Sequence, residues 1–278
     1  MKRPVVLPAI IALIAAAFFV LPLIATFHFS LKMKRGELSF EAYRSVLSSD
    51  VFVSALGFSA LASFAAIVLG VVLVVPTAYW VRLRLPRLRP AIEFLSLLPL
   101  IIPPVVLVFG YVRVYGTSSI LPLTMTQTGT TVLLIIGYVV LSLPYMYRAV
   151  DNGMGAIDIT TLTEAAESLG SSRLRTITTV IFPNVRSAIL SGAFLTFSIS
   201  LGEFVITSLL NRPGLGPYMV QIGQDRAYEP AAIAIMAFAF TWGCMILMSY
   251  FANRRPGARL VPRFLTPRLP ARRRSPSP

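Results

Sequence analysis

The side chains that could do chemistry are few, and they form no recognisable catalytic pattern. The 278 residues include one histidine, one cysteine and eleven acidic residues scattered along the chain. His28 ends one apolar run and Cys244 lies inside another, so we expect neither a metal site, which needs several converging ligands, nor a disulfide. The sequence lacks a GxxxxGK[ST] phosphate loop, an HExxH pair and a GxSxG elbow. It therefore predicts neither ATP binding nor catalysis on this chain.

The most structured polar segment is the loop at residues 149–185, between two long apolar runs. Asp158 stands where a helix N-cap would, with Thr161 three residues later. Gly170 stands where a C-cap glycine would, and Ser171 or Ser172 could cap a second helix. We expect that helix to run from Arg173 to about Phe182, where Pro183 interrupts it. The pattern predicts two short helices joined at a glycine, outside the bilayer.

This helix pair has the properties of a docking element. A helix that enters a cleft of another protein needs a slim surface, which Ala165 and Ala166 supply. Glu164 can pair with a basic residue on either chain. A sharp change of direction needs a residue that tolerates positive φ, and Gly170 is such a residue. These residues therefore predict that the loop docks on a partner protein.

The elements that must position the loop are membrane spans. The chain is 56% hydrophobic and 13% charged, and its mean hydropathy is +0.76. Several charge-free runs exceed the roughly 18 residues that mark a spanning helix. Six spans are expected, at about 5–29, within 51–81, and at about 92–112, 131–148, 186–210 and 230–252. The run near the N-terminus is longer than a signal peptide's apolar region, so we interpret it as an uncleaved span, with a cleaved signal as the lesser alternative.

The net charge of +14 is placed beside the membrane. Lys2 and Arg3 precede the first span, four arginines lie between the second and third, and eight follow the last, from Arg254 to Arg274. With six spans these segments share one side, which the positive-inside rule makes cytoplasmic, together with both termini and loop 149–185. The loop at 30–50 weakens this assignment because it also carries four basic residues. The basic tail either binds anionic membrane lipids or simply fixes the topology, and no nucleic-acid binding is expected.

Three residues could line a path through the membrane. The third span carries Pro103 with two other prolines, which indicates either a kinked pathway helix or an ordinary kink in a packed bundle. Apart from Arg186 at its edge, Glu203 is the only charge in the predicted fifth span. Its carboxylate either lines the pathway and attracts a cation, or is neutralised by hydrogen bonding to a neighbouring helix or sits near the outer interface. Phe204 beside it serves as packing or as a substrate contact.

Two acidic residues, Asp225 and Glu229, lie in the outer loop before the sixth span. They could contact an extracytoplasmic binding protein, although a solvated loop is the simpler interpretation. The sequence divides into residues 1–50 with the first span and outer loop, a core at 51–253 with five spans and loop 149–185, and a basic disordered cytoplasmic tail at 254–278.

One segment resembles the EAA signature of permease subunits of binding-protein-dependent ABC importers. It consists of Glu164-Ala165-Ala166, three further residues, Gly170, nine further residues and Val180-Ile181-Phe182-Pro183. The resemblance extends over about residues 50–253, including LPLIIPPVVLVFG at 98–110 and SISLGEFVITSLL at 198–210. Leu169 stands where sugar-type members have Asp, and Phe182 where Leu is usual. LGEFVI looks most similar to polyamine-type permeases, with iron(III), thiamine and oxyanion types as the next resemblances.

The resemblance implies an all-α membrane protein with six transmembrane helices, the methionine-importer-like type I permease fold and cytoplasmic coupling helices. It implies a bacterial inner-membrane permease that is not an enzyme and holds no cofactor. ATP and Mg would be bound by two partner ATPase subunits, into which Glu164, Ala165, Ala166, Gly170 and Pro183 would dock. A second, different permease and an extracytoplasmic binding protein would complete an importer for polyamine, or for iron(III), thiamine or phosphonate-type solutes. An autonomous membrane enzyme or a scaffold protein is the alternative from another class.

Overall fold

The protein is known from a computed structural model, which describes residues 6–34 and 36–253. This part of the chain is helical, with turns between the helices. Its elements are α1 (Val6–Ser30), α2 (Glu41–Leu47), α3 (Asp50–Leu83), the 3₁₀ turn η1 (Pro86–Leu88), α4 (Arg89–Ile101), α5 (Pro104–Tyr115), the 3₁₀ turn η2 (Leu123–Met125), α6 (Gln127–Gly155), α7 (Ile159–Ser168), α8 (Arg173–Arg175), the π-helical turn η3 (Thr176–Ile181), α9 (Phe182–Leu201), α10 (Val205–Leu209), α11 (Leu215–Asp225) and α12 (Glu229–Asn253).

The predicted spans correspond to real helices. Over the described ranges, five helices are long and apolar enough to cross a membrane, and six if the bent pair α4–α5 counts as one span. Two boundaries differ from the prediction. Helix α6 continues to Gly155, about two turns beyond 148, and α9 ends at Leu201 rather than near 210.

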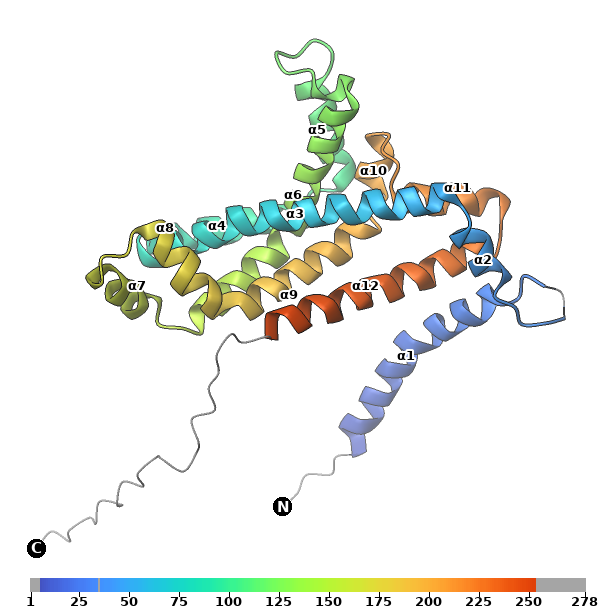
Figure 1. Ribbon diagram of the computed structural model, residues 1–278, viewed down its shortest axis with the longest axis horizontal. Helices are drawn as coiled ribbons and strands as arrows, with labels where there is room; N and C mark the ends of the chain where they lie inside the picture. Colours follow the sequence, from blue (N-terminus) through green and yellow to red (C-terminus); the bar gives the residue numbers. More distant parts are fainter. Residues whose placement is uncertain (1–5, 35, 254–278) are drawn as a thin grey trace, which may run out of the picture.

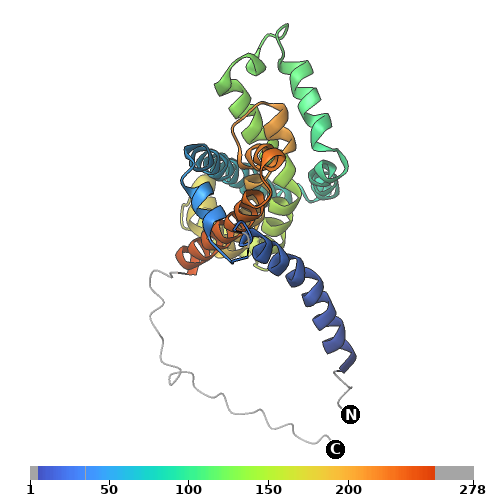
Figure 2. The same ribbon diagram turned by 90° about the vertical axis from the view of Figure 1, so that its right-hand side faces the viewer.

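The third predicted span is broken, and the expectation of one continuous kinked helix is wrong. Helices α4 and α5 meet at 98°, with only Ile102 and Pro103 between them. Pro103 and Pro104 lack the amide hydrogens needed to bond back to the preceding turn, so the helix ends at Ile101 and restarts with Pro104. Helix α5 consequently rises away from the main bundle beside the start of α6 (Figures 1 and 2).

The centre of the bundle is formed by α3, α6 and α9, which lie against one another (Figure 1). Lipid is as apolar as these side chains, so the packing relies on close helix approach and small residues. A Cβ on Gly153 of α6 would lie 2.3 Å from the Cβ of Ala188, and one on Gly192 of α9 would lie 2.6 Å from the sulfur of Met146. Both positions therefore require glycine for the α6–α9 contact.

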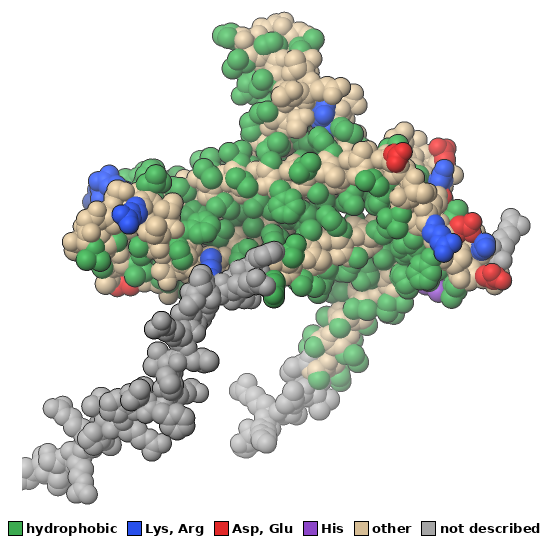
Figure 3. Space-filling model, in the orientation of Figure 1, with side chains coloured by type: hydrophobic (Ala, Val, Ile, Leu, Met, Phe, Trp, Pro, Cys, Tyr) green, Lys and Arg blue, Asp and Glu red, His purple; other side chains and the backbone are tan. Residues whose placement is uncertain are grey.

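Charged side chains gather at the two ends of this bundle. Figure 3 shows basic side chains, which are arginines, over the end that carries α7 and α8, mixed charges near α2 and α11 at the other end, and a mainly hydrophobic surface between them. The charge pattern agrees with helices that cross an apolar layer. Lys2, Arg3 and the basic tail at 254–278 lie outside the described residues.

Candidate functional site

The end of the bundle formed by α7, α8 and η3 holds the residues predicted to dock on a partner. Helix α7 begins as predicted at Asp158, whose carboxylate accepts hydrogen bonds from the Thr161 backbone amide (3.1 Å) and hydroxyl (2.8 Å). These bonds favour the ionised carboxylate and hold the pKa of Asp158 below its ordinary value, although the residue is exposed. The cap thus fixes where the docking helix starts.

One face of α7 is anchored to the membrane bundle. Ile159, Thr163 and Ala166 are buried, and the first packs in the main core. The Thr163 hydroxyl shares a 3.2 Å hydrogen bond with the hydroxyl of Tyr79, a buried residue on α3. Helix α7 is therefore hydrogen-bonded to a spanning helix, α3.

The turn after α7 is a Schellman motif at Gly170. The Ser171 amide donates to the Ala166 carbonyl (3.0 Å), and the Gly170 amide donates to the Glu167 carbonyl (2.9 Å). Gly170 has a φ of +76°, a conformation that other residues adopt at a cost. The prediction of a C-cap glycine is confirmed. The positive φ of Gly170 turns the chain directly toward the next helix.

The outer face of the turn is exposed and presents both polar and apolar groups. Glu164 and Ala165 are exposed beside Gly170, whereas Ala166 faces inward. Leu169 and Leu174, on either side of the glycine, are 89% and 71% exposed. Sequence reasoning missed these two leucines, although two isolated apolar residues in a polar loop were the available signal. These two exposed apolar side chains, called the Leu169–Leu174 tip below, flank the glycine turn.

The second helix differs from the prediction in its extent. Ser172 occupies the N-cap position, but its side chain makes no capping hydrogen bond. Pro183 does not interrupt the helix. It lies in the first turn of α9, and the helical run continues from Arg173 to Leu201 through the wide π turn η3. Pro183 has no amide hydrogen to donate, and the π turn before it shifts the backbone hydrogen-bond pattern at this point. The second helix of the loop and the span therefore form one continuous helical run.

An ion cluster that sequence reasoning missed lies just behind the coupling end. Asp151 of α6 is buried and accepts two hydrogen bonds from the Arg82 guanidinium of α3, one of them at 2.8 Å. Arg89 at the start of α4 donates to the same carboxylate at 3.0 Å and to Glu93 at 2.8 Å. Helices α3, α4 and α6 therefore share one buried carboxylate, which lies next to a cavity of about 320 Å³ that Tyr147 also lines.

Comparison with known proteins identifies the family. Residues 70–256 match the family described as the binding-protein-dependent transport system inner membrane component. The chain belongs to this family. It is therefore a multi-pass permease of the inner membrane, which is not a catalytic subunit and carries no cofactor, and it works with an ATPase and a periplasmic binding protein.

Curated relatives of this permease transport different solutes. A probable molybdenum ABC transporter permease of Haloferax volcanii is 28% identical over 204 residues, which are 69% of this chain and 74% of the relative. The spermidine/putrescine permease PotB of Escherichia coli is 26% identical over 222 residues, 74% and 78% of the two chains. The ferric permease FbpB of Actinobacillus pleuropneumoniae is 30% identical over 167 residues, 55% of this chain and 23% of the relative.

Solved structures place the fold. A bacterial ABC transporter that imports the acidic polysaccharide alginate matches 92% of this permease and 98% of its own chain with a TM-score of 0.70 at 16% identity. The MetNI methionine transporter in an inward-facing conformation matches 77% of this permease and 96% of its own chain, with a TM-score of 0.52 at 20% identity. The methionine-importer-like fold expected from the sequence is confirmed.

Glu203 of the permease lies between α9 and α10, outside either helix. Its carboxylate accepts hydrogen bonds of 2.8–3.1 Å from the amides of Val205, Ile206 and Thr207 and from the Thr207 hydroxyl. The Thr207 hydroxyl continues the chain to the Tyr138 hydroxyl of α6 at 2.6 Å. These contacts account for a carboxylate in an apolar region, because they replace the hydrogen bonds that water would provide. Its role in the pathway stays a prediction.

The other predicted site residues are dispersed. Phe204 is 41% exposed beside Glu203, and Pro103 is exposed at the α4–α5 break. Asp225 is exposed at the end of α11, whereas Glu229 is buried at the start of α12 and pairs with Arg226 at 3.2 Å. Glu229 therefore offers less free surface for a binding protein than Asp225 does. Among the described residues, no three His, Cys, Asp or Glu side chains gather as metal ligands.

Proposed function

We propose that this permease forms half of the translocation pathway of an ABC importer and couples solute uptake to two ATPase subunits through α7 and the turn after it. The observation that carries the proposal is the exposed Leu169–Leu174 tip, fixed by Gly170 and tied to α3 through Thr163 and Tyr79. An apolar tip on a rigid turn suits a cleft in another protein, and its anchorage gives any movement of that cleft a route into the membrane.

The coupling follows from differential binding. ATP closes the partner subunits, their clefts carry the docked loops with them, and the state of the membrane helices that fits the new loop position becomes favoured. Since Arg173–Leu201 is one helical run, loop movement and the tilt of α9 are mechanically linked. Alternating access between this permease and a second, different one then moves the solute inward.

We propose polyamine as the substrate class. Support comes from the LGEFVI segment around Glu203 and from the spermidine/putrescine relative, which aligns over 222 residues. Molybdate is the second candidate, because the Haloferax relative aligns over 204 residues at slightly higher identity. The two substrates have opposite charge, so Glu203→Gln would weaken uptake of a polyamine and leave that of molybdate unchanged.

The test is purification of the native complex in mild detergent, followed by mass spectrometry of its proteins and bound small molecules. An ATPase, a second permease and a binding protein that carries a polyamine would support the proposal in full. Another bound solute would replace the substrate class and keep the mechanism. A folded preparation without any ATPase would contradict the coupling role and favour a scaffold.

A further inference from the structure

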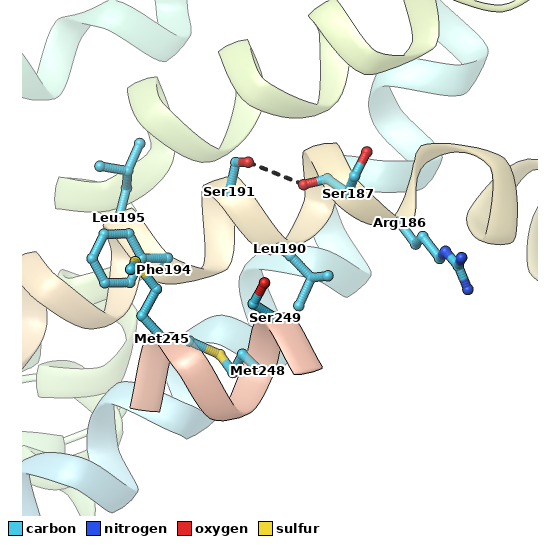
Figure 4. Close-up of a pocket in the computed structure, with 9 residues that line it drawn as sticks. All are labelled: Arg186, Ser187, Leu190, Ser191, Phe194, Leu195, Met245, Met248 and Ser249. Carbon is cyan, nitrogen blue, oxygen red and sulfur yellow. Dashed lines mark hydrogen bonds between the residues drawn. The ribbon is translucent and has the colours of Figure 1, made fainter. Parts of the chain in front are cut away.

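A groove between α9 and α12 lies outside the coupling site and the ion cluster. It has a volume of about 560 Å³ and opens on the surface of the bundle. Figure 4 shows its lining, with Arg186 and Ser187 at the coupling end of α9, and Phe194 and Leu195 further along the same helix. The opposite wall is formed by Met245, Met248 and Ser249 of α12.

The groove is divided by polarity. Leu190, Phe194, Leu195 and the two methionines form an apolar middle, and unbranched methionine side chains adapt to a flexible chain. The Ser191 hydroxyl is satisfied by the Ser187 carbonyl at 3.0 Å, so it adds little polarity. The polar end is Arg186, which forms no ion pair with any residue in the described part of the chain.

The positive charge of Arg186 at the polar end indicates which kind of molecule the groove binds. Arg186 lies in the second turn of α9, next to loop 149–185, so its guanidinium stands at the end of the groove nearest that loop (Figure 4). Basic grooves between spanning helices on this side of a membrane favour anionic headgroups, and the apolar middle suits an acyl chain.

We propose that this groove binds one anionic phospholipid of the inner leaflet. The phosphate lies at Arg186, and an acyl chain lies between Phe194 and Met248. The lipid fills the gap between α9 and α12, so it stabilises the contact of the final span with the helix that carries the coupling loop.

The test compares phosphatidylglycerol retained by the whole complex, measured by native mass spectrometry after reconstitution in mixed phosphatidylglycerol and phosphatidylcholine. Arg186→Gln is expected to retain phosphatidylglycerol about fivefold more weakly, because one basic residue near the headgroup is lost. The matched control is Arg148→Gln, an exposed arginine on α6 outside the groove, which should retain the lipid as the unmodified protein does. Met248→Trp, which fills the groove, should also reduce retention.

A second measurement distinguishes lipid from protein as the occupant. The photoreactive amino acid benzoylphenylalanine at the exposed Ser191 should form an adduct with the mass of a phospholipid. Crosslinking to the second permease instead would overturn the proposal. Retention of phosphatidylglycerol by Arg186→Gln and Met248→Trp at the level of the unmodified protein would also overturn it. Neither readout depends on the transported solute or on ATPase docking.

Discussion

At the scale of single residues, function depends on a few residues whose backbone conformations are fixed by local hydrogen bonds. Gly170 is the clearest case, because its φ of +76° costs a β-branched residue more than glycine. Gly170→Val should weaken ATPase docking roughly tenfold, since the left-handed conformation costs about 1–2 kcal/mol. Binding of the partner ATPase to the reconstituted permease measures this. Gly36, with a φ of +83° in an outer loop, provides the control, because Gly36→Val carries similar strain without affecting docking.

Asp158 predicts a pH dependence of the docking helix. Its pKa is lowered in the folded state, so its contribution to α7 is present above the ordinary pKa of an aspartate and is lost as pH falls through the lower folded value. The protection factors of the α7 amides, which correct for the intrinsic pH dependence of hydrogen exchange, should fall in acid. Asp158→Asn keeps a capping oxygen without a titrating group and should remove this acid dependence, whereas Asp158→Ala should accelerate exchange at every pH. Identical pH profiles for the unmodified protein and Asp158→Asn would contradict the capping role.

At the scale of helices, the buried ion cluster holds α3, α4 and α6 together. Asp151→Asn leaves Arg82 without its charge partner, and Arg82 is only 20% exposed. Loss of one partner of a buried pair costs about 3–5 kcal/mol, and we expect the lower end because the guanidinium is partly hydrated. Unfolding of the purified permease in mixed micelles measures the loss.

The control for this cluster is Glu93→Gln. Glu93 pairs with Arg89 while 45% exposed, so its removal should cost less than about 1 kcal/mol. Equal destabilisation by the two substitutions would show that burial of Asp151 does not set the strength of the cluster.

At the scale of the whole molecule, the bent pair α4–α5 decides the topology. If the pair is one span, Arg87 before it and Ser118 after it lie on opposite sides of the membrane. Cysteines at Arg87 and Ser168 should then react with an impermeant maleimide only in permeabilised cells, and a cysteine at Ser118 should react in intact cells. Reaction of Arg87→Cys and Ser118→Cys from the same side would indicate a re-entrant pair. Replacement of Cys244 with Ser removes the background reaction.

The sequence by itself predicted the approximate position of the spans, because apolar runs this long are stable only in a membrane or a buried core. It also located the helical loop at 149–185, its N-cap at Asp158 and its turn at Gly170. These features depend on neighbouring residues along one chain segment, where hydrogen bonds and φ preferences act locally.

Only the tertiary structure decided which distant groups meet. Asp151 pairs with Arg82 and Arg89, which are 69 and 62 residues away in the sequence. The prolines indicated a disturbed third span, but not a 98° break, and the single charge at Glu203 did not reveal that it caps α10. Spanning helices are apolar on nearly every side, so their sequences carry little periodic information about which face packs inward. The contacts are chosen by shape and by buried hydrogen bonds, which exist only once the helices are packed.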